Sequence, residues 1–313
     1  MSGRLKVRYF FALAAFVAAC GGGSSGGSNG TPGGPTINPP PIVPQTIVMI
    51  GAGDIGDCSV LADGGIHARD TARMMDATTA DAIFTAGDNA YPLGSSDDFT
   101  CYENTWGRFK SKTFPVPGNH EYYQPGALPY FQYFGARAGE GGFRTGYYSF
   151  NLGNWHIVAL NSPLQASGGF DQIMWLKDDL QSSNAKCTLA IWHYPIFTSG
   201  PSNGSPESRV MREAWQVLFD GGADLIVNGH DHLYERFAPQ SPDGRRNDAT
   251  GITQIIAGTG GAPLYQFGGT MPNSTAQLRA YGLLKLTLQA TSFDSVFLPV
   301  AGAPFDQYHG TCH

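Results

Sequence analysis

The stretch Thr46–Asp54, TIVMIGAGD, is a short apolar run followed by a glycine turn and an aspartate. Residues 46–50 are mostly β-branched, which predicts a buried strand that ends at a glycine. Residues 81–86 repeat this pattern before a second Gly-Asp pair, and residues 65–77 between them carry apolar positions at helical spacing. We therefore expect a strand–helix–strand unit, and a connection of this length favours parallel strands.

The rest of the chain continues to alternate between short strands and helices. Expected strands lie at residues 114–117, 187–192, 224–227, 283–288 and 295–300, a hairpin at 147–162, and helices at 171–180 and from Ser205 to the glycine pair 221–222. Ser205 is the expected N-cap of the last helix, with proline and glutamate in its first turn. This alternation predicts an α/β protein.

Five short motifs place polar side chains after strands. They are Gly53-Asp54, Gly87-Asp88-Asn89-Ala90-Tyr91, Gly118-Asn119-His120-Glu121, Trp192-His193 and Gly229-His230-Asp231-His232. Side chains that follow the carboxyl ends of parallel strands can converge on one crevice. Carboxylate, phenolate, amide and imidazole groups together are the ligands expected of a two-metal hydrolase centre with a bridging carboxylate.

In this order, the motifs GD, GDxxY, GNHE, H and GHxH resemble those of the calcineurin-like metallophosphoesterase superfamily. Tyr91 makes them most similar to the purple acid phosphatases. The resemblance extends over about residues 46–300. It implies a four-layer αββα sandwich, in which two mixed sheets pack together and helices cover their outer faces.

The resemblance also implies how the residues share two metal ions. Asp54, Asp88, Tyr91 and His232 would hold one ion, and Asp88, Asn119, His193 and His230 the other, with Asp88 bridging. The first set suits Fe(III), and the second suits a divalent ion such as Fe, Zn or Mn. Metal-bound hydroxide would attack a small phosphate monoester in line. His120 resembles the family histidine that contacts phosphate and protonates the leaving alkoxide.

Several of these residues have other interpretations when taken singly. Asp54 could be a turn residue, Tyr91 could pack in a turn before proline, and His193 could be a core histidine. Residues 51–56 also satisfy GxGxxG after a strand, which is typical of dinucleotide binding. However, Asp54 would place a negative charge beside the pyrophosphate. For Glu121, Glu235 and Arg236 a structural role is at least as reasonable as a catalytic one. Residues 258–261 could line the pocket, but we favour a plain glycine turn.

Three alternative functions remain open at this stage. The first is a phosphodiesterase or nucleotidase on the same scaffold, distinguished by its substrate profile. The second is a lipid-anchored protein that binds metal or phosphate without turnover. The third is a surface interaction protein that uses the scaffold structurally, against which the seven intact ligand positions argue.

The first 45 residues lie outside the expected catalytic domain, residues 46–313. Residues 1–20 combine a basic start and an apolar core with Val17-Ala18-Ala19-Cys20, which resembles a bacterial lipobox. Cleavage there would leave Cys20 lipid-modified; the alternative is an ordinary secretory signal. Residues 21–45 are rich in Gly, Ser and Pro and suit a tether. We expect an exported, lipid-anchored protein in the outer membrane or periplasm or at the cell surface.

The charge of the chain argues against a nucleic-acid partner. Charged residues make up only 14% of the sequence and hydrophobic residues 42%, as in a globular domain. Without residues 1–20 the balance is 16 basic against 25 acidic residues, a net charge of −9. A phosphate backbone would require a basic surface.

Four cysteines remain once Cys20 is assigned to lipid, and an even number in an exported chain favours two disulfides. Cys58 and Cys101 each follow a proposed ligand strand, whereas Cys187 precedes a strand. Of the three possible pairings we therefore favour Cys58–Cys101 with Cys187–Cys312. A four-thiolate zinc site is the alternative, although the chain has no CxxC spacing to support it.

Overall fold

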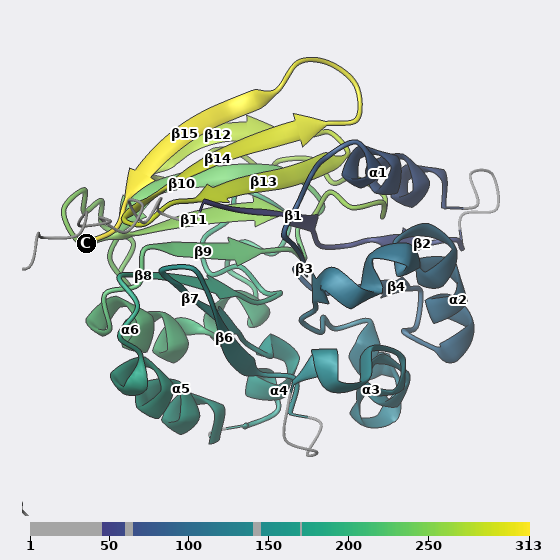
Figure 1. The fold of residues 1–313 in the computed structure, drawn as a ribbon, viewed down its shortest axis with the longest axis horizontal. Helices are drawn as coiled ribbons and strands as arrows, with labels where there is room; N and C mark the ends of the chain where they lie inside the picture. Colours follow the sequence, from purple (N-terminus) through teal and green to yellow (C-terminus); the bar gives the residue numbers. More distant parts are fainter. Residues whose placement is uncertain (1–45, 60–64, 140–144, 170) are drawn as a thin grey trace, which may run out of the picture. The chain divides into compact units, whose positions relative to one another are not determined.

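The computed structural model describes residues 46–59, 65–139, 145–169 and 171–313, and its strands form two large mixed sheets (Figure 1). The strands of the first sheet are β1 (Ile47–Ala52), β3 (Ala82–Thr85), β5 (Thr113–Phe114), β13 (Gly282–Leu288), β14 (Ser292–Pro299) and β15 (Phe305–Thr311). Their order is β15-β14-β13-β1-β3-β5. β1, β3 and β5 are parallel, as the sequence predicts for the first two, and β13 to β15 add antiparallel strands.

The second sheet has a parallel centre and antiparallel edges. Its strands are β6 (Tyr148–Leu152), β7 (Trp155–Ala159), β8 (Cys187–Ile191), β9 (Leu225–Asn228), β10 (Tyr234–Gln240), β11 (Ile252–Ala257) and β12 (Ser274–Leu278). Their order is β12-β10-β11-β9-β8-β7-β6. A separate parallel pair, β2 (Gly56–Asp57) with β4 (Ala90–Tyr91), lies beside the predicted ligand loops.

Helices cover the outer faces of the two sheets (Figure 1). The α-helices are α1 (Ile66–Asp76), α2 (Ser96–Thr105), α3 (Leu128–Phe134), α4 (Ser162–Ala166), α5 (Asp171–Ser182) and α6 (Arg212–Asp220). Short 3₁₀ turns are η1 (Gly107–Lys112), η2 (Glu121–Tyr123), η3 (Pro125–Ala127), η4 (Gly135–Ala138) and η5 (Glu207–Arg209). α1, α2 and α3 pack on the first sheet, and α5 and α6 pack on the second.

Successive side chains of the buried strands enter different cores. Met49 of β1 and Phe84 of β3 point between the sheets, where they join Leu189 of the second sheet. Their neighbours Ile50 and Ile83 face the helices α1 to α3. Because both faces of these strands are covered, their sequences are continuous apolar runs. These three cores confirm the predicted αββα sandwich.

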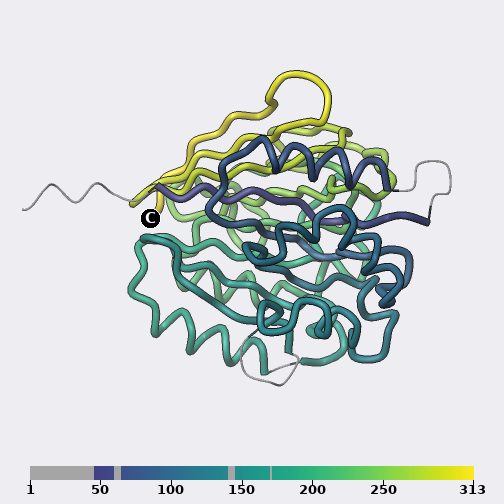
Figure 2. The backbone as a smooth tube through the Cα atoms, turned by 45° about the vertical axis from the view of Figure 1, so that its right-hand side comes forward, coloured from purple at the N-terminus to yellow at the C-terminus, as the bar shows by residue number. Residues whose placement is uncertain are grey.

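The first strands of the chain lie in the middle of the first sheet. Figure 2 shows the purple β1 between the yellow C-terminal strands and the blue segment that contains β3, in agreement with its pairing to β13 and β3. The chain therefore completes this sheet only when its last strands return. Among the described residues, no helix is long and apolar enough to cross a membrane.

The predicted helix from Ser205 is wrong at its start. The structure has the 3₁₀ turn η5 there, and α6 begins only at Arg212. Met211, which is fully buried, adopts φ −95° and ψ 9° and separates the two segments. Ser205 still accepts a hydrogen bond from the backbone N–H of Ser208, so its capping role is local to the 3₁₀ turn.

The dinucleotide-binding interpretation of residues 51–56 is also rejected by the structure. That fingerprint requires a helix to open directly after the glycines. Here β2 follows instead, and the first helix among the described residues, α1, begins at Ile66. The run Gly258–Gly261, expected as a plain turn, packs against the Asp54 loop, because the N–H of Gly260 donates to the carbonyl oxygen of Gly53 at 2.9 Å.

The structure confirms the favoured disulfide pairing and excludes a four-thiolate zinc site. Cys58 pairs with Cys101 and Cys187 with Cys312, with Cα–Cα distances of 6.0 and 5.4 Å. The first bond joins the chain after β2 to helix α2. The second joins the start of β8 to the chain after β15, and so links the two sheets.

Replacing Cys187 and Cys312 together by alanine is expected to destabilise the fold more than replacing Cys58 and Cys101. The bonds span 125 and 43 residues, for which loop entropy sets upper values of about 5 and about 4 kcal/mol. Urea denaturation of each double variant, with reduced wild type as control, measures the free energy of unfolding. Equal midpoints for all proteins would contradict the expectation.

Candidate metal centre

The predicted ligands follow strands of both sheets. Asp54 follows β1, Asp88 follows β3, His193 follows β8 and His230 follows β9. The structure brings all seven predicted ligands into one connected cluster, namely Asp54, Asp88, Tyr91, Asn119, His193, His230 and His232. The carboxyl ends of the parallel strands in the two sheets therefore supply one common site.

The first half of the cluster surrounds the Tyr91 hydroxyl. This oxygen lies 2.9 Å from Asp54 Oδ1, 3.0 Å from Asp88 Oδ2 and 3.1 Å from His232 Nε2. Asp54 Oδ1 and His232 Nε2 are 3.2 Å apart. Two atoms bound at about 2.1 Å to one cation, at right angles to each other, lie about 3.0 Å apart. The spacing of these donors therefore fits a shared metal ion.

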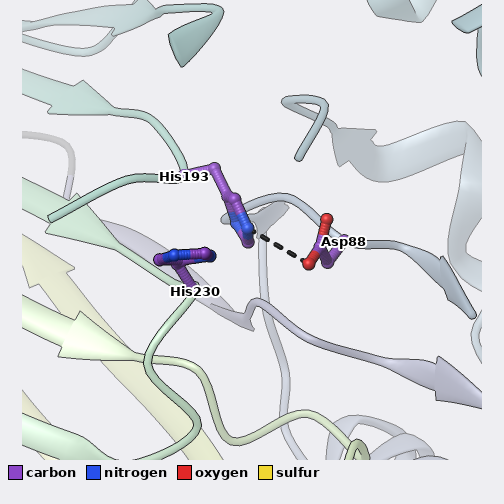
Figure 3. Close-up of side chains that lie close together, drawn as sticks. All are labelled: Asp88, His193 and His230. Carbon is purple, nitrogen blue, oxygen red and sulfur yellow. Dashed lines mark ion pairs between the residues drawn. The ribbon is translucent and has the colours of Figure 1, made fainter. Parts of the chain in front are cut away.

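The second half is centred on His193. Its Nε2 lies 3.2 Å from Asp88 Oδ2 and 3.1 Å from Asn119 Oδ1. Figure 3 shows His193 and Asp88 directed toward each other, with His230 beside them. One donor atom from each of these three residues lies within 4.8 Å of the others. Together with Asn119, these residues offer one carboxylate, one amide oxygen and two imidazoles.

Asp88 belongs to both halves. Its Oδ2 contacts Tyr91 of the first half and His193 of the second. Its Oδ1 accepts the backbone N–H of His120 at 2.8 Å, which fixes the orientation of the carboxylate. A carboxylate held between two donor sets is the geometry required of a bridging ligand.

Backbone carbonyls orient the histidine rings. His193 Nδ1 lies 2.8 Å from the carbonyl oxygen of Ala86, and His232 Nδ1 lies 2.7 Å from that of Pro263. In the neutral ring, a hydrogen bond at Nδ1 leaves Nε2 with its lone pair facing the site, as metal-binding histidines require. These contacts show that the donor set fits two cations.

Three of the predicted ligands have backbone conformations that L-residues rarely adopt. Asp54 has φ 60°, Asp88 φ 48° and His230 φ 72°, and they account for half of the six non-glycine residues with positive φ in the described part of the chain. Such conformations cost about 1–3 kcal/mol each and concentrate at functional sites. The folded scaffold therefore holds these loops in a shape that local preference opposes.

Two glycines are required because the loops approach each other closely. A Cβ atom at Gly118 would lie 2.1 Å from Asp88 Oδ1, and one at Gly87 would lie 2.4 Å from His193 Nδ1. Gly87 also has φ 87°. Gly118 thus makes room for Asp88, and Gly87 for His193, each a ligand from another motif.

The buried charges of the site interact strongly. Burial opposes ionisation of Asp88, but the adjacent histidines, His193 foremost, outweigh it and hold the pKa of this carboxyl well below its usual range. Burial disfavours protonation of His193, yet Asp88 and then Asp54 raise its pKa to about 9. Burial and then His193 lower the pKa of His230 to about 4. Burial and the two carboxylates raise the pKa of Tyr91 well above its ordinary value.

His120 lies at the more open side of the site. Its side chain is 22% exposed, and its Nε2 is 3.8 Å from Asp88 Oδ2. Its Nδ1 lies 2.6 Å from the carbonyl oxygen of Pro92, and its ring packs at 4.1 Å from that of Tyr91. The histidine therefore presents Nε2 to the metal site while its other nitrogen is held by the backbone.

Glu121 has a structural part in the site. Its buried carboxylate accepts the backbone N–H groups of Gly118 at 2.7 Å and Asn89 at 2.8 Å, and so ties two ligand motifs together. Burial, followed by the charge of Asp88, raises its pKa to about 8. The carboxylate of Glu235 accepts hydrogen bonds from Ser199 and so has a structural role as well.

Three tyrosines beside the site were not predicted from the sequence. Tyr194, Tyr265 and Tyr123 contact the rings of His230, His232 and His120, respectively. Tyr194 adjoins a predicted motif, but Tyr265 reaches the site only through the folded loop after β11. Their positions follow from tertiary packing.

Comparison with known proteins agrees with this geometry. Residues 50–234, more than half of the chain, match the family model described as calcineurin-like phosphoesterase. Purple acid phosphatase 15 of Arabidopsis thaliana is 30% identical over 66% of this chain and 45% of its own length. Probable purple acid phosphatase 20 of the same plant is 35% identical over 37% of this chain and 28% of its own length. The chain thus spans less than half of these curated relatives.

Solved structures show the same fold. A purple acid phosphatase from yellow lupin seeds superposes with a TM-score of 0.66 at 19% identity, covering 85% of this chain and 53% of the other. A dimetal phosphatase from Danio rerio has a TM-score of 0.60 at 14% identity, covering 85% of this chain and 99% of the other. The chain belongs to the calcineurin-like phosphoesterase family, with purple acid phosphatases among its relatives, and this membership implies a dinuclear metal centre.

Proposed function

We propose that this protein is a two-metal phosphomonoesterase of the purple acid phosphatase type. The observation that supports it most strongly is the shared position of Asp88, whose Oδ2 lies 3.0 Å from Tyr91 of one donor set and 3.2 Å from His193 of the other. Its substrate is a small phosphate ester. The family match, the connected donor cluster and the partly exposed His120 agree with this function.

Each donor set suits a different class of metal ion. Asp54, Asp88, Tyr91 and His232 would hold one ion, and Asp88, Asn119, His193 and His230 the other. Two carboxylates and a phenolate suit a hard trivalent ion, which we propose to be Fe(III). The amide oxygen and two imidazoles suit divalent Fe, Zn or Mn.

When bound, the two cations would supply Lewis acidity toward the phosphoryl oxygens and lower the pKa of water. The chain itself supplies orientation and a proton. The N–H of His120 Nδ1 is donated to the carbonyl oxygen of Pro92, which fixes the ring. Its Nε2 faces the site and would protonate the oxygen of the leaving alcohol, a step suited to a positioned histidine.

Replacing His120 with asparagine is expected to lower kcat for a phosphomonoester by about 100-fold or more, because a general acid contributes at least that much. Metal content should stay at the wild-type value, since no predicted ligand is removed. Steady-state kinetics on phenyl phosphate and metal analysis of the same preparation measure both quantities. His309→Ala is the matched control, because His309 is an exposed histidine on β15.

The alternatives give different results in this assay. A phosphodiesterase or nucleotidase would prefer a diester or nucleotide to phenyl phosphate in the wild-type protein. A protein that only binds metal or phosphate would show no turnover before or after the His120 substitution. Unchanged kcat in His120→Asn would refute the proposed general acid.

Metal loading is expected to release protons at pH 7. His193, with a pKa of about 9 in the metal-free site, and Tyr91, with a raised pKa, are protonated there and must lose protons to bind a cation. His230, with a pKa of about 4, is already neutral. Metal affinity should therefore rise with pH between 6 and 9.

Calorimetric titration of the metal-free protein with Zn²⁺, in two buffers of different ionisation enthalpy, counts the protons released. Tyr91→Phe is the matched variant, and it should release about one proton fewer while it keeps the His193 contribution. Binding that releases no protons and does not depend on pH between 6 and 9 would contradict the protonation states assigned to the site.

The proposed membrane anchor at Cys20 lies outside the described residues. Support comes from the lipobox-like sequence, from the Gly/Ser/Pro-rich residues 21–45, and from two disulfides in the catalytic domain. Disulfides persist in oxidising compartments, as expected of an exported protein. The tether would hold the domain at a membrane surface.

The anchor is tested by expressing the full chain and Cys20→Ala in a bacterium that processes lipoproteins. Detergent phase separation of cell fractions should place the wild-type chain in the detergent phase and the variant in the aqueous phase. The variant keeps the other four cysteines and therefore the domain's disulfides. Equal aqueous partition of both proteins would argue for an ordinary secretory signal.

A further inference from the structure

Exposed apolar side chains are concentrated beside the metal site. In the part of the chain that the structure describes, the exposed large hydrophobic residues are Ile66, Leu93, Tyr123, Met174, Tyr265 and Val300. Leu93, Tyr123 and Tyr265, with exposures of 51, 57 and 37%, adjoin residues of the candidate site. We call these three residues the apolar rim.

Tyr265 forms one side of the rim. Its ring stacks on that of His232, with centroids 4.0 Å apart and an angle of 10° between the planes. Its backbone N–H donates to the carbonyl oxygen of His232 at 2.9 Å. Arg279 donates from Nε to the carbonyl oxygen of Tyr265 at 3.1 Å and from Nη2 to that of Leu264 at 3.2 Å. The ring is therefore held beside the first donor set, while 37% of the residue stays exposed.

Tyr123 and Leu93 form the other side. The Tyr123 ring meets that of His120 edge to face, with centroids 4.9 Å apart. Leu93 follows Pro92, whose carbonyl oxygen lies 2.6 Å from His120 Nδ1, and Gln124 Nε2 donates to the carbonyl oxygen of Leu93 at 3.2 Å. Both side chains thus lie next to the histidine that would face a leaving group.

Aromatic rings from three loops contact the histidines of the site. Tyr123 contacts His120, Tyr265 stacks on His232, and Tyr194 contacts His230 with ring centroids 4.7 Å apart. These rings therefore border the same group of ligands.

The groups that face the buried carboxylates are histidines, Tyr91 and backbone N–H groups. Among the described residues, no lysine or arginine forms an ion pair with Asp54 or Asp88. Arg279 directs its donors at backbone carbonyls. The exposed side chains that adjoin the ligand histidines are therefore aromatic and aliphatic, while the nearby Arg279 is held against backbone carbonyls of the Tyr265 loop.

We propose that the apolar rim binds the alcohol portion of the substrate and selects phosphate monoesters whose leaving group carries an aromatic ring over those with a short alkyl group. This inference rests on the proposed phosphatase function. Tyr265 and Tyr123 are specificity residues, which contact the ring of the leaving group from opposite sides. Aromatic pairs prefer stacked or edge-to-face contacts at 4.5–7 Å between centroids, and an open ring on each side permits both.

The test uses two anions with the same head group that the enzyme cannot hydrolyse, phenylphosphonate and methylphosphonate. Calorimetry on the metal-loaded full chain gives the ratio of their dissociation constants, independently of turnover. The variants are Tyr123→Leu, Tyr265→Leu, Tyr123→Phe and Tyr265→Phe, with Met174→Ala as control. Met174 is 66% exposed on α5, which packs on the second sheet and not at the rim.

Wild type is expected to bind phenylphosphonate about tenfold or more tightly than methylphosphonate, since two aromatic contacts add to the affinity. Each leucine variant should lose about two- to tenfold of this preference with methylphosphonate unchanged, whereas both phenylalanine variants and Met174→Ala should keep it. Absence of a wild-type preference, or equal weakening of both phosphonates by leucine, would overturn the inference.

Parallel kcat/KM measurements on phenyl phosphate and ethyl phosphate separate the two proposals. Phosphonate preference without hydrolysis of either ester would refute the phosphatase function and show only that the rim binds an aromatic group. Hydrolysis of the esters without any phosphonate preference would refute the rim inference alone. Tyr123 is the more exposed of the two tyrosines, so its variants report on the rim even where substitution of Tyr265 disturbs His232.

Discussion

The buried carboxylate of Asp88 is the group on which the arrangement of the site depends. It touches a phenol from its own loop and an imidazole from the other sheet. Burying a carboxylate is costly unless positive charge or hydrogen bonds compensate for it. In the metal-free chain His193 provides this compensation, and its pKa rises to about 9 as a result. Two cations would satisfy the same requirement and bring together the loops of both sheets.

The scaffold explains why this arrangement can persist. Three separate cores hold β1, β3, β8 and β9 rigidly, and the ligands extend just past the ends of these strands. The strained backbone at Asp54, Asp88 and His230 opposes the fold locally, and the surrounding close-packed structure outweighs it. Glu121 adds a direct link between two of the motifs. Sites built on rigid elements in this way hold their donors in place before a ligand binds.

The sequence predicts much of this structure because strands buried on both faces have a distinctive pattern. Residues 46–50 and 81–86 are sufficient to predict the parallel pair of strands β1 and β3. The prediction of the layered arrangement rests on the family resemblance of the motifs. The sequence pattern does not indicate strand β10, because this strand buries two charged residues, Glu235 and Arg236. Their burial depends on partners distant in sequence, such as Ser199 and Asp306. The apolar rim could not be predicted either, because its side chains meet only after the chain folds.

The measurement that tests this account most directly is the metal content of the chain, purified without chelators, alongside its Asp88→Ala variant. Mass spectrometry of the metals should find about two ions per wild-type chain, one iron and one divalent ion, as the two donor sets imply. Asp88→Ala should retain neither at full occupancy, because both sets share this carboxylate. A wild-type chain that holds no metal even after reconstitution, or an Asp88 variant that keeps both ions, would contradict the account.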